Sequence, residues 1–160
     1  MSFSRNRVVN WEPLGSTRIE PETMYTIAVQ AHYDSAHRLR DYQGKCARLH
    51  GHRYVVQVAV QAPDLGDGEM VYDFSDLKAH LRALAEELDH QNLNDIPPFT
   101  EIESTAENQA RYFFQEMKKR LPPELASGLL YARVSESPGQ WAAYGPGPVF
   151  PDSGYPQEGG

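Results

Sequence analysis

The histidines at positions 50 and 52, separated by a single glycine, most constrain how this chain can fold. Successive side chains of a strand point to opposite faces, so residues i and i+2 share a face with Cα atoms roughly 7 Å apart. Two imidazoles placed in this way can converge on one metal ion, and Gly51 removes side-chain bulk between them. A third imidazole from a neighbouring strand would complete a site with an open coordination position. The pattern therefore predicts a sheet, with His37 upstream as the third ligand.

Two segments alternate between apolar and polar residues as half-buried strands do, and they cover residues 25–34 and 53–61. His50 and His52 have the parity of Tyr54 in the second segment, so they lie on its face if that strand begins early. Two shorter segments, 130–134 and 141–144, predict a third and a fourth strand.

Two helices are expected between the strand pairs. The first has an apolar stripe and starts at Asp73 or Ser75, and its stripe consists of Leu77, Leu81, Leu84 and Leu88. The second starts at residues 104–107, where Ser104 and Glu107 fit a capping box, and Pro122 and Pro123 end it. Paired strands with grouped helices predict an α+β fold, a four-stranded antiparallel sheet with two helices on one face. The other face is not strongly polar, so self-association is expected.

The chain of 160 residues is most simply one domain. Residues 1–22 have no clear period and are interpreted as an N-terminal extension. Residues 23–145 form the predicted catalytic domain, and residues 146–160, rich in glycine and proline, are expected to be a flexible tail.

Composition excludes several classes of protein. One cysteine precludes an internal disulfide, which together with the absence of a secretory-type apolar stretch predicts a cytoplasmic protein. No apolar run approaches the about 20 residues that span a bilayer, so no membrane association is expected. The net charge of −7 argues against nucleic-acid binding. Residues 38–53 nevertheless contain five cations and one acid. This basic segment is either a binding site for a phosphorylated substrate or a solvated loop. The cations are Arg38, Arg40, Lys45, Arg48 and Arg53.

Zinc is the metal that best suits His37, His50 and His52, because three imidazoles with a free position describe catalytic zinc sites. The alternative is that some of these rings are ordinary core or surface histidines, but their spacing favours ligands. Cys46 is expected to be a catalytic base, because a nearby dication and Lys45 would favour its thiolate form. A fourth zinc ligand or an inert buried thiol remain alternatives for Cys46, since spacing does not separate them.

Asp89 and His90 follow the first helix and can form an acid/base pair in which the carboxylate orients the imidazole. The alternative, a histidine that interacts with the helix dipole beside a solvated Asp89, is slightly favoured by the sequence alone. Glu107 can be explained without a catalytic role, because it fits the capping box. Glu136, placed after the third strand, can likewise be an ordinary carboxylate at the surface.

Taken in order, these motifs resemble the family of 6-pyruvoyltetrahydropterin and 6-carboxytetrahydropterin synthases, which have the tunnelling fold (T-fold). The resemblance covers about residues 24–144. It departs from the family where Ser104-Thr105 replaces the usual Pro-Thr and Glu136-Ser137 replaces Glu-Thr. The matching segments are Asp34-Ser-Ala-His37, Cys46-Ala-Arg-Leu-His50-Gly-His52, Gly68-Glu-Met-Val-Tyr-Asp73, Leu88-Asp89-His90-Gln-Asn-Leu-Asn94, Ser104-Thr-Ala-Glu107 and Val134-Ser-Glu136.

The resemblance implies that His37, His50 and His52 bind Zn²⁺ and that Cys46 is the catalytic thiolate. It implies that Asp89 and His90 are its acid/base partners, that Glu136 anchors the pterin ring, and that Thr105 and Glu107 contribute further pterin contacts. It also implies a homohexamer made of two barrel-forming trimers, with active sites at subunit interfaces and Asp89–His90 supplied by a neighbouring subunit.

The activity implied is that of a zinc-dependent lyase acting on 7,8-dihydroneopterin triphosphate. The leading expectation is 6-carboxy-5,6,7,8-tetrahydropterin synthase, which releases acetaldehyde and triphosphate and serves queuosine-type 7-deazaguanine biosynthesis. The alternatives are 6-pyruvoyltetrahydropterin synthase, which serves tetrahydrobiopterin biosynthesis, and a non-catalytic zinc-binding T-fold module. Retention of Cys46, Asp89 and His90 argues against the non-catalytic module.

Overall fold

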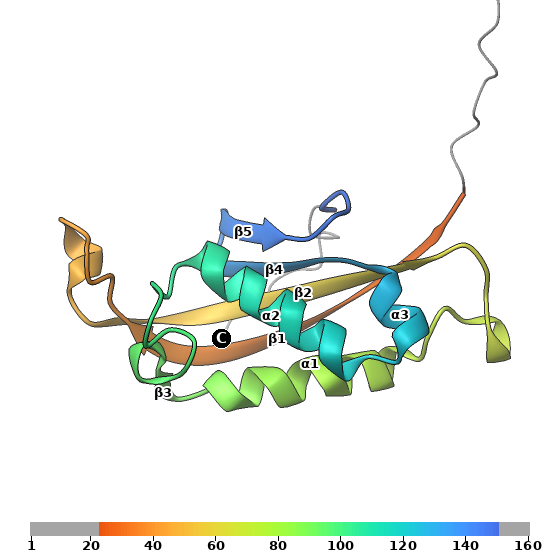
Figure 1. The fold of residues 1–160 in the computed structure, drawn as a ribbon, viewed down its shortest axis with the longest axis horizontal. Helices are drawn as coiled ribbons and strands as arrows, with labels where there is room; N and C mark the ends of the chain where they lie inside the picture. The colour runs from red at the N-terminus through yellow and green to blue at the C-terminus, as the bar shows by residue number, and fades with distance from the viewer. Residues whose placement is uncertain (1–22, 151–160) are drawn as a thin grey trace, which may run out of the picture.

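The computed structural model of the protein describes residues 23–150, so the extension predicted over 1–22 and the tail after 150 lie outside it. Along the described residues two long strands come first, three helices with one two-residue strand among them follow, and two strands come last, with three short 3₁₀ turns in the connections (Figure 1). The elements are β1 (Tyr25–His37), η1 (Lys45–Ala47), β2 (His50–Ala62), η2 (Asp67–Glu69), α1 (Phe74–Leu88), β3 (Gln91–Asn92), η3 (Leu93–Asp95), α2 (Ala106–Arg120), α3 (Pro123–Ser127), β4 (Leu129–Ser137) and β5 (Gln140–Tyr144).

The sheet has five strands in the order β3-β1-β2-β4-β5. Its four longer strands are antiparallel, as predicted, but β3 adds a fifth strand parallel to β1. The prediction of a four-stranded, fully antiparallel sheet was therefore wrong, because it lacked β3. Two residues are too few to show an alternating pattern, and β3 exists only because the chain leaving α1 returns along the edge of β1.

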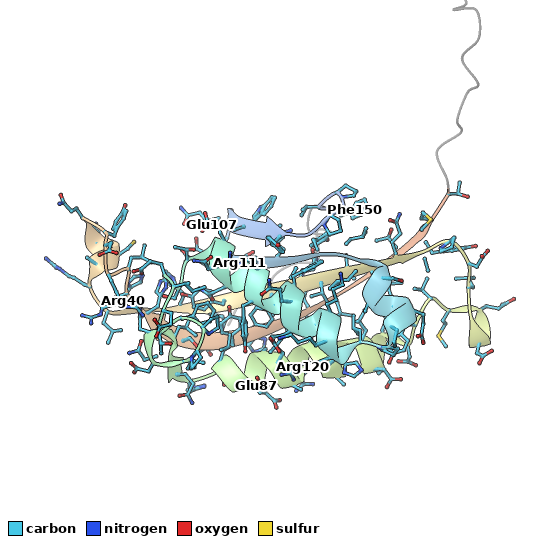
Figure 2. The ribbon with its side chains drawn as sticks, viewed as in Figure 1. Arg40, Glu87, Glu107, Arg111, Arg120 and Phe150 are labelled. Carbon is cyan, nitrogen blue, oxygen red and sulfur yellow. The ribbon has the colours of Figure 1, made fainter. Side chains whose placement is uncertain are left out.

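Helices α1 and α2 cover one face of the sheet, so the predicted α+β layering is confirmed (Figure 1). An ion pair between Glu87 of α1 and Arg120 of α2, with 2.6 Å between Oε1 and the guanidinium nitrogen, joins the two helices at the surface (Figure 2). None of the helices within residues 23–150 has the length and apolar character that a membrane crossing requires.

The apolar stripe predicted for α1 is buried in full, and Asp73 caps the helix by accepting a hydrogen bond from the Ser75 N–H at 2.6 Å. The buried face of α2 carries Ala110, Phe113, Phe114 and Met117. These side chains pack on the sheet residues Tyr33, Tyr54, Val56 and Val58, which are 0 % exposed, and form one core. The core therefore lies between the helices and the sheet face that leads to the three histidines.

The predicted capping box is not formed. Thr105, not Ser104, is the N-cap of α2, and its hydroxyl accepts from the Asn108 N–H at 3.3 Å. Glu107 is then the second helical residue and cannot reach back as a box requires. Ser104 is instead fully buried, and it contacts His37.

The segments that follow α2 and β5 have structure that the sequence patterns did not predict. Pro122 and Pro123 end α2 as predicted, but Pro123 also starts the short helix α3, a position where proline is favoured. After β5 the chain stays on β4, where the Gly147 N–H donates to the Leu130 carbonyl at 3.1 Å and Val149 packs against the small cluster of Ala59, Leu130 and Tyr131.

Candidate active site

The three predicted metal ligands meet at one end of the β1–β2 pair. His37 ends β1 and lies directly opposite His50, the first residue of β2, while His52 lies opposite Ser35. Residues that are directly opposite each other in an antiparallel pair point to the same face. One ring nitrogen of each histidine lies within 4.8 Å of those of the other two. The second strand was predicted from residue 53, but β2 begins at His50, so the condition for the shared face is met and the parity prediction is confirmed.

Two backbone carbonyls fix the tautomers of His37 and His50. The His37 Nδ1 lies 2.9 Å from the Ser104 carbonyl oxygen, and the His50 Nδ1 lies 2.7 Å from that of Arg48. A carbonyl only accepts, so each neutral ring carries its proton on Nδ1 and directs the lone pair of Nε2 outward. Those two Nε2 atoms are 3.1 Å apart. Two lone pairs at this distance repel each other unless a proton or a metal ion lies between them.

The spacing suits a small divalent cation. Ligand nitrogens about 2.0–2.1 Å from a tetrahedral zinc lie about 3.3 Å from one another, close to the observed separation. Burial is the largest influence on both His37 and His52, and it lowers the pKa of each ring. Both imidazoles are therefore held in the neutral form that metals require. The three histidines fit a metal, and zinc in particular.

Tyrosines form the floor beneath the histidine rings. Tyr54 lies with its ring centroid 5.8 Å from His37 and 5.4 Å from His52, and it stacks on Tyr33 at 5.0 Å. Burial, its largest influence, raises the pKa of Tyr54, so its hydroxyl stays protonated. This packed aromatic layer restricts how the His37 and His52 rings can rotate.

Glu136 lies beside the histidine cluster. It belongs to β4, whereas the sequence analysis placed it after the strand, and its Oε1 is 4.0 Å from the His37 Nε2. Its side chain is 27 % exposed, so the carboxylate is accessible at the rim of the cluster. An accessible carboxylate at this place can accept hydrogen bonds from a ligand that approaches the metal.

Cys46 lies in η1, in the connection between β1 and β2, and is half-buried. Its carbonyl accepts from the Leu39 N–H at 2.9 Å, which ties η1 back to the end of β1. Among residues 23–150 the ligand cluster consists of three histidines only, so the Cys46 sulfur lies outside it.

Asp89 and His90 form the expected pair directly after α1. The His90 Nδ1 lies 2.6 Å from the Asp89 Oδ2, and the other carboxylate oxygen accepts from the Asp34 N–H at 2.7 Å. The His90 N–H donates to the Asp34 carbonyl at 2.6 Å, which holds His90 at a φ of 54°. The His90 side chain is 77 % exposed and the Asp89 side chain 36 %. The pair is thus fixed by the backbone of β1 and open to solvent.

An arginine–aspartate pair that the sequence did not indicate adjoins Asp89 and His90. Arg53 binds both carboxylate oxygens of Asp34 at 3.0 Å, and this hydrogen bonding is the largest cause of the lowered pKa of Asp34. Asp34 and Arg53 are opposite each other in the register and lie on the sheet face away from the three histidines. Together with His90 they line a hollow of about 530 Å³. The hollow also borders His52, so His90 lies at the same end of the β1–β2 pair as the histidine cluster, although Asp34 and Arg53 are on the other sheet face.

The remaining predicted residues are dispersed. The Thr105 hydroxyl caps α2, and Glu107 is exposed at the start of that helix (Figure 2); neither belongs to the histidine cluster. Of the five cations, Arg53 pairs with Asp34 and the Arg40 guanidinium donates to the Phe99 carbonyl. Arg38, Lys45 and Arg48 are exposed. The basic patch is therefore smaller than its composition indicated.

The sequence model of the family described as 6-pyruvoyl tetrahydropterin synthase matches residues 26–147. The chain belongs to this family. A 6-carboxy-5,6,7,8-tetrahydropterin synthase of Synechocystis is 38 % identical over 110 residues, which cover 65 % of this chain and 83 % of the relative. One of Aquifex aeolicus is 35 % identical over 96 residues, or 48 % of this chain and 59 % of the relative. The human 6-pyruvoyl tetrahydrobiopterin synthase is 39 % identical over 92 residues, or 55 % and 61 %.

The matches to the Aquifex and human relatives thus span less than two thirds of those proteins. Among solved structures, the Caenorhabditis elegans 6-pyruvoyl tetrahydropterin synthase superposes with a TM-score of 0.70 at 29 % identity, covering 77 % of this chain and 96 % of that one. The fold expected from the resemblance, that of 6-pyruvoyl tetrahydropterin synthases, is confirmed. The family is one of pterin synthases, which are enzymes, and this agrees with the enzyme class expected from the sequence.

Proposed function

We propose that the protein is a zinc-dependent 6-carboxy-5,6,7,8-tetrahydropterin synthase. It would convert 7,8-dihydroneopterin triphosphate and water into 6-carboxytetrahydropterin, acetaldehyde and triphosphate. The observation that carries the proposal is the convergence of His37, His50 and His52, with two ring tautomers fixed by carbonyls, in a pterin synthase fold. The bacterial relatives of this name favour the carboxylated product.

The three histidines would hold Zn²⁺, which when bound supplies a Lewis acid that polarises the hydroxyl groups of the substrate side chain. The Cys46 thiolate would remove a proton from that side chain, a role that its position outside the ligand cluster leaves open. A second proton would move through His90. Because His90 directs Nδ1 at Asp89, its Nε2 is the nitrogen available to accept and return a proton.

Substrate recognition is proposed for residues around this centre. Glu136 at the rim of the cluster can accept two hydrogen bonds from the amino group and ring N–H of a pterin. Thr105 and Glu107, at the N-terminus of α2, would add further pterin contacts. The triphosphate would bind the exposed cations Arg38, Lys45 and Arg48 of the connection between β1 and β2, because positive side chains attract a polyanion.

A second subunit would complete each active site. The His90 side chain is exposed at the sheet edge and does not belong to the histidine cluster, which leaves it available to a site on a neighbouring chain. We propose the homohexamer of two barrel-forming trimers that the family resemblance implies. The strands β3 and β5 at the two sheet edges supply pairing surfaces for closing such a barrel. A role in 7-deazaguanine biosynthesis and a cytoplasmic location remain predictions.

The product distinguishes the proposal from the alternative 6-pyruvoyltetrahydropterin synthase, which the name of the human relative favours. Both reactions release triphosphate, but only the first releases acetaldehyde. We expect the zinc-loaded protein incubated with 7,8-dihydroneopterin triphosphate to produce acetaldehyde and a carboxylated pterin in equal amounts, measured by mass spectrometry. Triphosphate release with a pyruvoyl pterin and no acetaldehyde would favour the alternative.

The non-catalytic alternative is tested at Cys46. Replacing Cys46 by Ala should leave zinc content near that of the wild type and lower turnover on the order of 10²–10⁴-fold, the usual contribution of a general base. Elemental analysis and the product assay measure the two effects separately. Equal turnover in the wild type and the variant would contradict the assignment of Cys46 as the base.

A further inference from the structure

We propose that Gln109 is a positioning residue that orients the His37 ring for metal binding. It lies in α2, one turn beyond the N-cap, and is 0 % exposed. The proposal rests on the metal centre proposed above, because it concerns the metal affinity of that centre. Gln109 touches neither the metal position nor the expected substrate, and it acts through the backbone carbonyl of Ser104.

A continuous chain of hydrogen bonds connects Gln109 to the metal cluster. The Tyr33 hydroxyl lies 2.6 Å from the Gln109 Oε1, and the Gln109 Nε2 donates to the Ser104 carbonyl at 2.8 Å. The same carbonyl accepts from the His37 Nδ1 at 2.9 Å. The Ser104 oxygen therefore uses both of its lone pairs, one for the amide and one for the imidazole.

The donors and acceptors in this chain have only one consistent arrangement. Because a carbonyl cannot donate, the NH₂ group of Gln109 must face Ser104 and its oxygen must face Tyr33, which then donates its proton. The same carbonyl requires the proton of the neutral His37 ring to be on Nδ1, so the Nε2 lone pair points to the cluster. The chain thereby determines both the tautomer and the direction of one metal ligand.

Burial makes this arrangement rigid. Tyr33 and Ser104 are, like Gln109, 0 % exposed, so a broken bond in the chain is not replaced by one to bulk water. The Tyr54 hydroxyl is also buried, and it forms no hydrogen bond among the described residues. A side chain without polar atoms at position 109 would leave Tyr33 and half of the Ser104 carbonyl unsatisfied. The carbonyl could then shift, and with it the ring of His37.

The test compares Gln109→Met, which keeps the length of the side chain and removes its polar atoms, with Gln115→Met. Gln115 is exposed on the same helix and is the matched control. Zinc affinity is measured by competition with a chromophoric chelator, and the visible spectrum of the Co²⁺-substituted protein reports ligand geometry. We expect Gln109→Met to weaken zinc binding by up to about 10-fold, the lower end of the about 10–100-fold usual for losing a direct outer partner of a ligand, because the Ser104 carbonyl is kept, and to alter the Co²⁺ bands. Gln115→Met should match the wild type.

A role confined to stability would lower the melting temperature of Gln109→Met without changing the Co²⁺ bands or the zinc affinity, and that result would overturn the proposal. If Gln109→Met does not fold, Tyr33→Phe takes its place, because it removes only the hydroxyl that holds the Gln109 oxygen. Tyr33→Phe should weaken zinc binding by a smaller factor, and unchanged affinity in this variant would then overturn the proposal. If the wild type does not bind zinc, the proposed metal centre is wrong. If the wild type binds zinc and the variant binds it equally well, only the role of Gln109 is wrong.

Discussion

The histidine cluster and the Asp89–His90 pair lie at the same end of β1, but the chain holds them in different ways. The cluster is built on the helix-covered face of the sheet, where His37 is 2 % exposed and two carbonyls fix the rings. The pair lies at the sheet edge, where the His90 side chain is 77 % exposed and the backbone of Asp34 holds both residues. One chain thus brings the three candidate ligands together by itself, whereas the Asp89–His90 pair is exposed at the sheet edge.

The largest effect is expected from removing a ring of the cluster. His50→Ala should abolish stoichiometric zinc binding and with it turnover, because two imidazoles leave the metal site incomplete. His32→Ala is the control, since His32 is exposed and lies on the other face of β1. Elemental analysis after dialysis measures the bound zinc. Undiminished zinc in His50→Ala would show that the cluster is not the metal site.

Mixing two inactive variants tests whether the two regions act across chains. Cys46→Ala and His90→Ala are each expected to be inactive, but unfolded and refolded together they should regain about a quarter of wild-type turnover, because a site formed by two subunits receives both intact residues in about a quarter of random pairings. Each variant refolded alone is the control. No recovery in a mixture of proven hetero-oligomers would mean that one chain supplies both residues.

A smaller effect, on the free energy of unfolding, is expected from the backbone conformation of His90. At a φ of 54°, a side chain beyond glycine is strained, and the bond to Asp34 maintains this conformation. His90→Gly should therefore be more stable than His90→Ala by about 1 kcal/mol, although both lack the proton-transferring ring. Urea unfolding of the two variants gives the difference. Equal stability would indicate that residue 90 does not adopt this conformation.

The smallest effect is expected from Arg53→Met. Hydrogen bonding to Arg53 lowers the pKa of Asp34, and the Asp34 N–H lowers that of Asp89. A carboxyl whose pKa is lowered by folding contributes stability above its unfolded pKa of about 3.9, and this contribution is lost as the pH falls through the folded value. The urea midpoints of wild type and variant should differ slightly at neutral pH and converge below about pH 4. A difference that persists at pH 2 would contradict the ion pair as its cause.

The cluster was predictable because it depends on local spacing, whereas its surroundings depend on packing. His50-Gly-His52 in a strand fixes which face the rings share, and the alternating pattern placed that strand. The pairing of Asp34 with Arg53 depends on a register that alternation alone does not determine. The strand β3 and the capping role of Thr105 depend likewise on tertiary contacts that have no signature in two or three residues.

The position of Gln109 in the sequence already indicates that its side chain is buried. It precedes Phe113 by four residues, so it lies on the buried face of α2 among Ala110, Phe113 and Met117. A buried glutamine requires hydrogen-bond partners, and this requirement alone predicts a polar chain in the core. Which partners it finds, Tyr33 and Ser104, depends on the packing of α2 over β1 and cannot be derived from helical spacing.

X-ray absorption spectroscopy of the zinc-loaded protein tests the central claim most directly, because it identifies the atoms that bind the metal. We predict one zinc per chain, surrounded by three imidazole nitrogens at about 2.0–2.1 Å and one further light atom, with no sulfur. A sulfur ligand at about 2.3 Å would make Cys46 a ligand and remove the proposed base. Fewer than three imidazoles would contradict the convergence of His37, His50 and His52 on one ion.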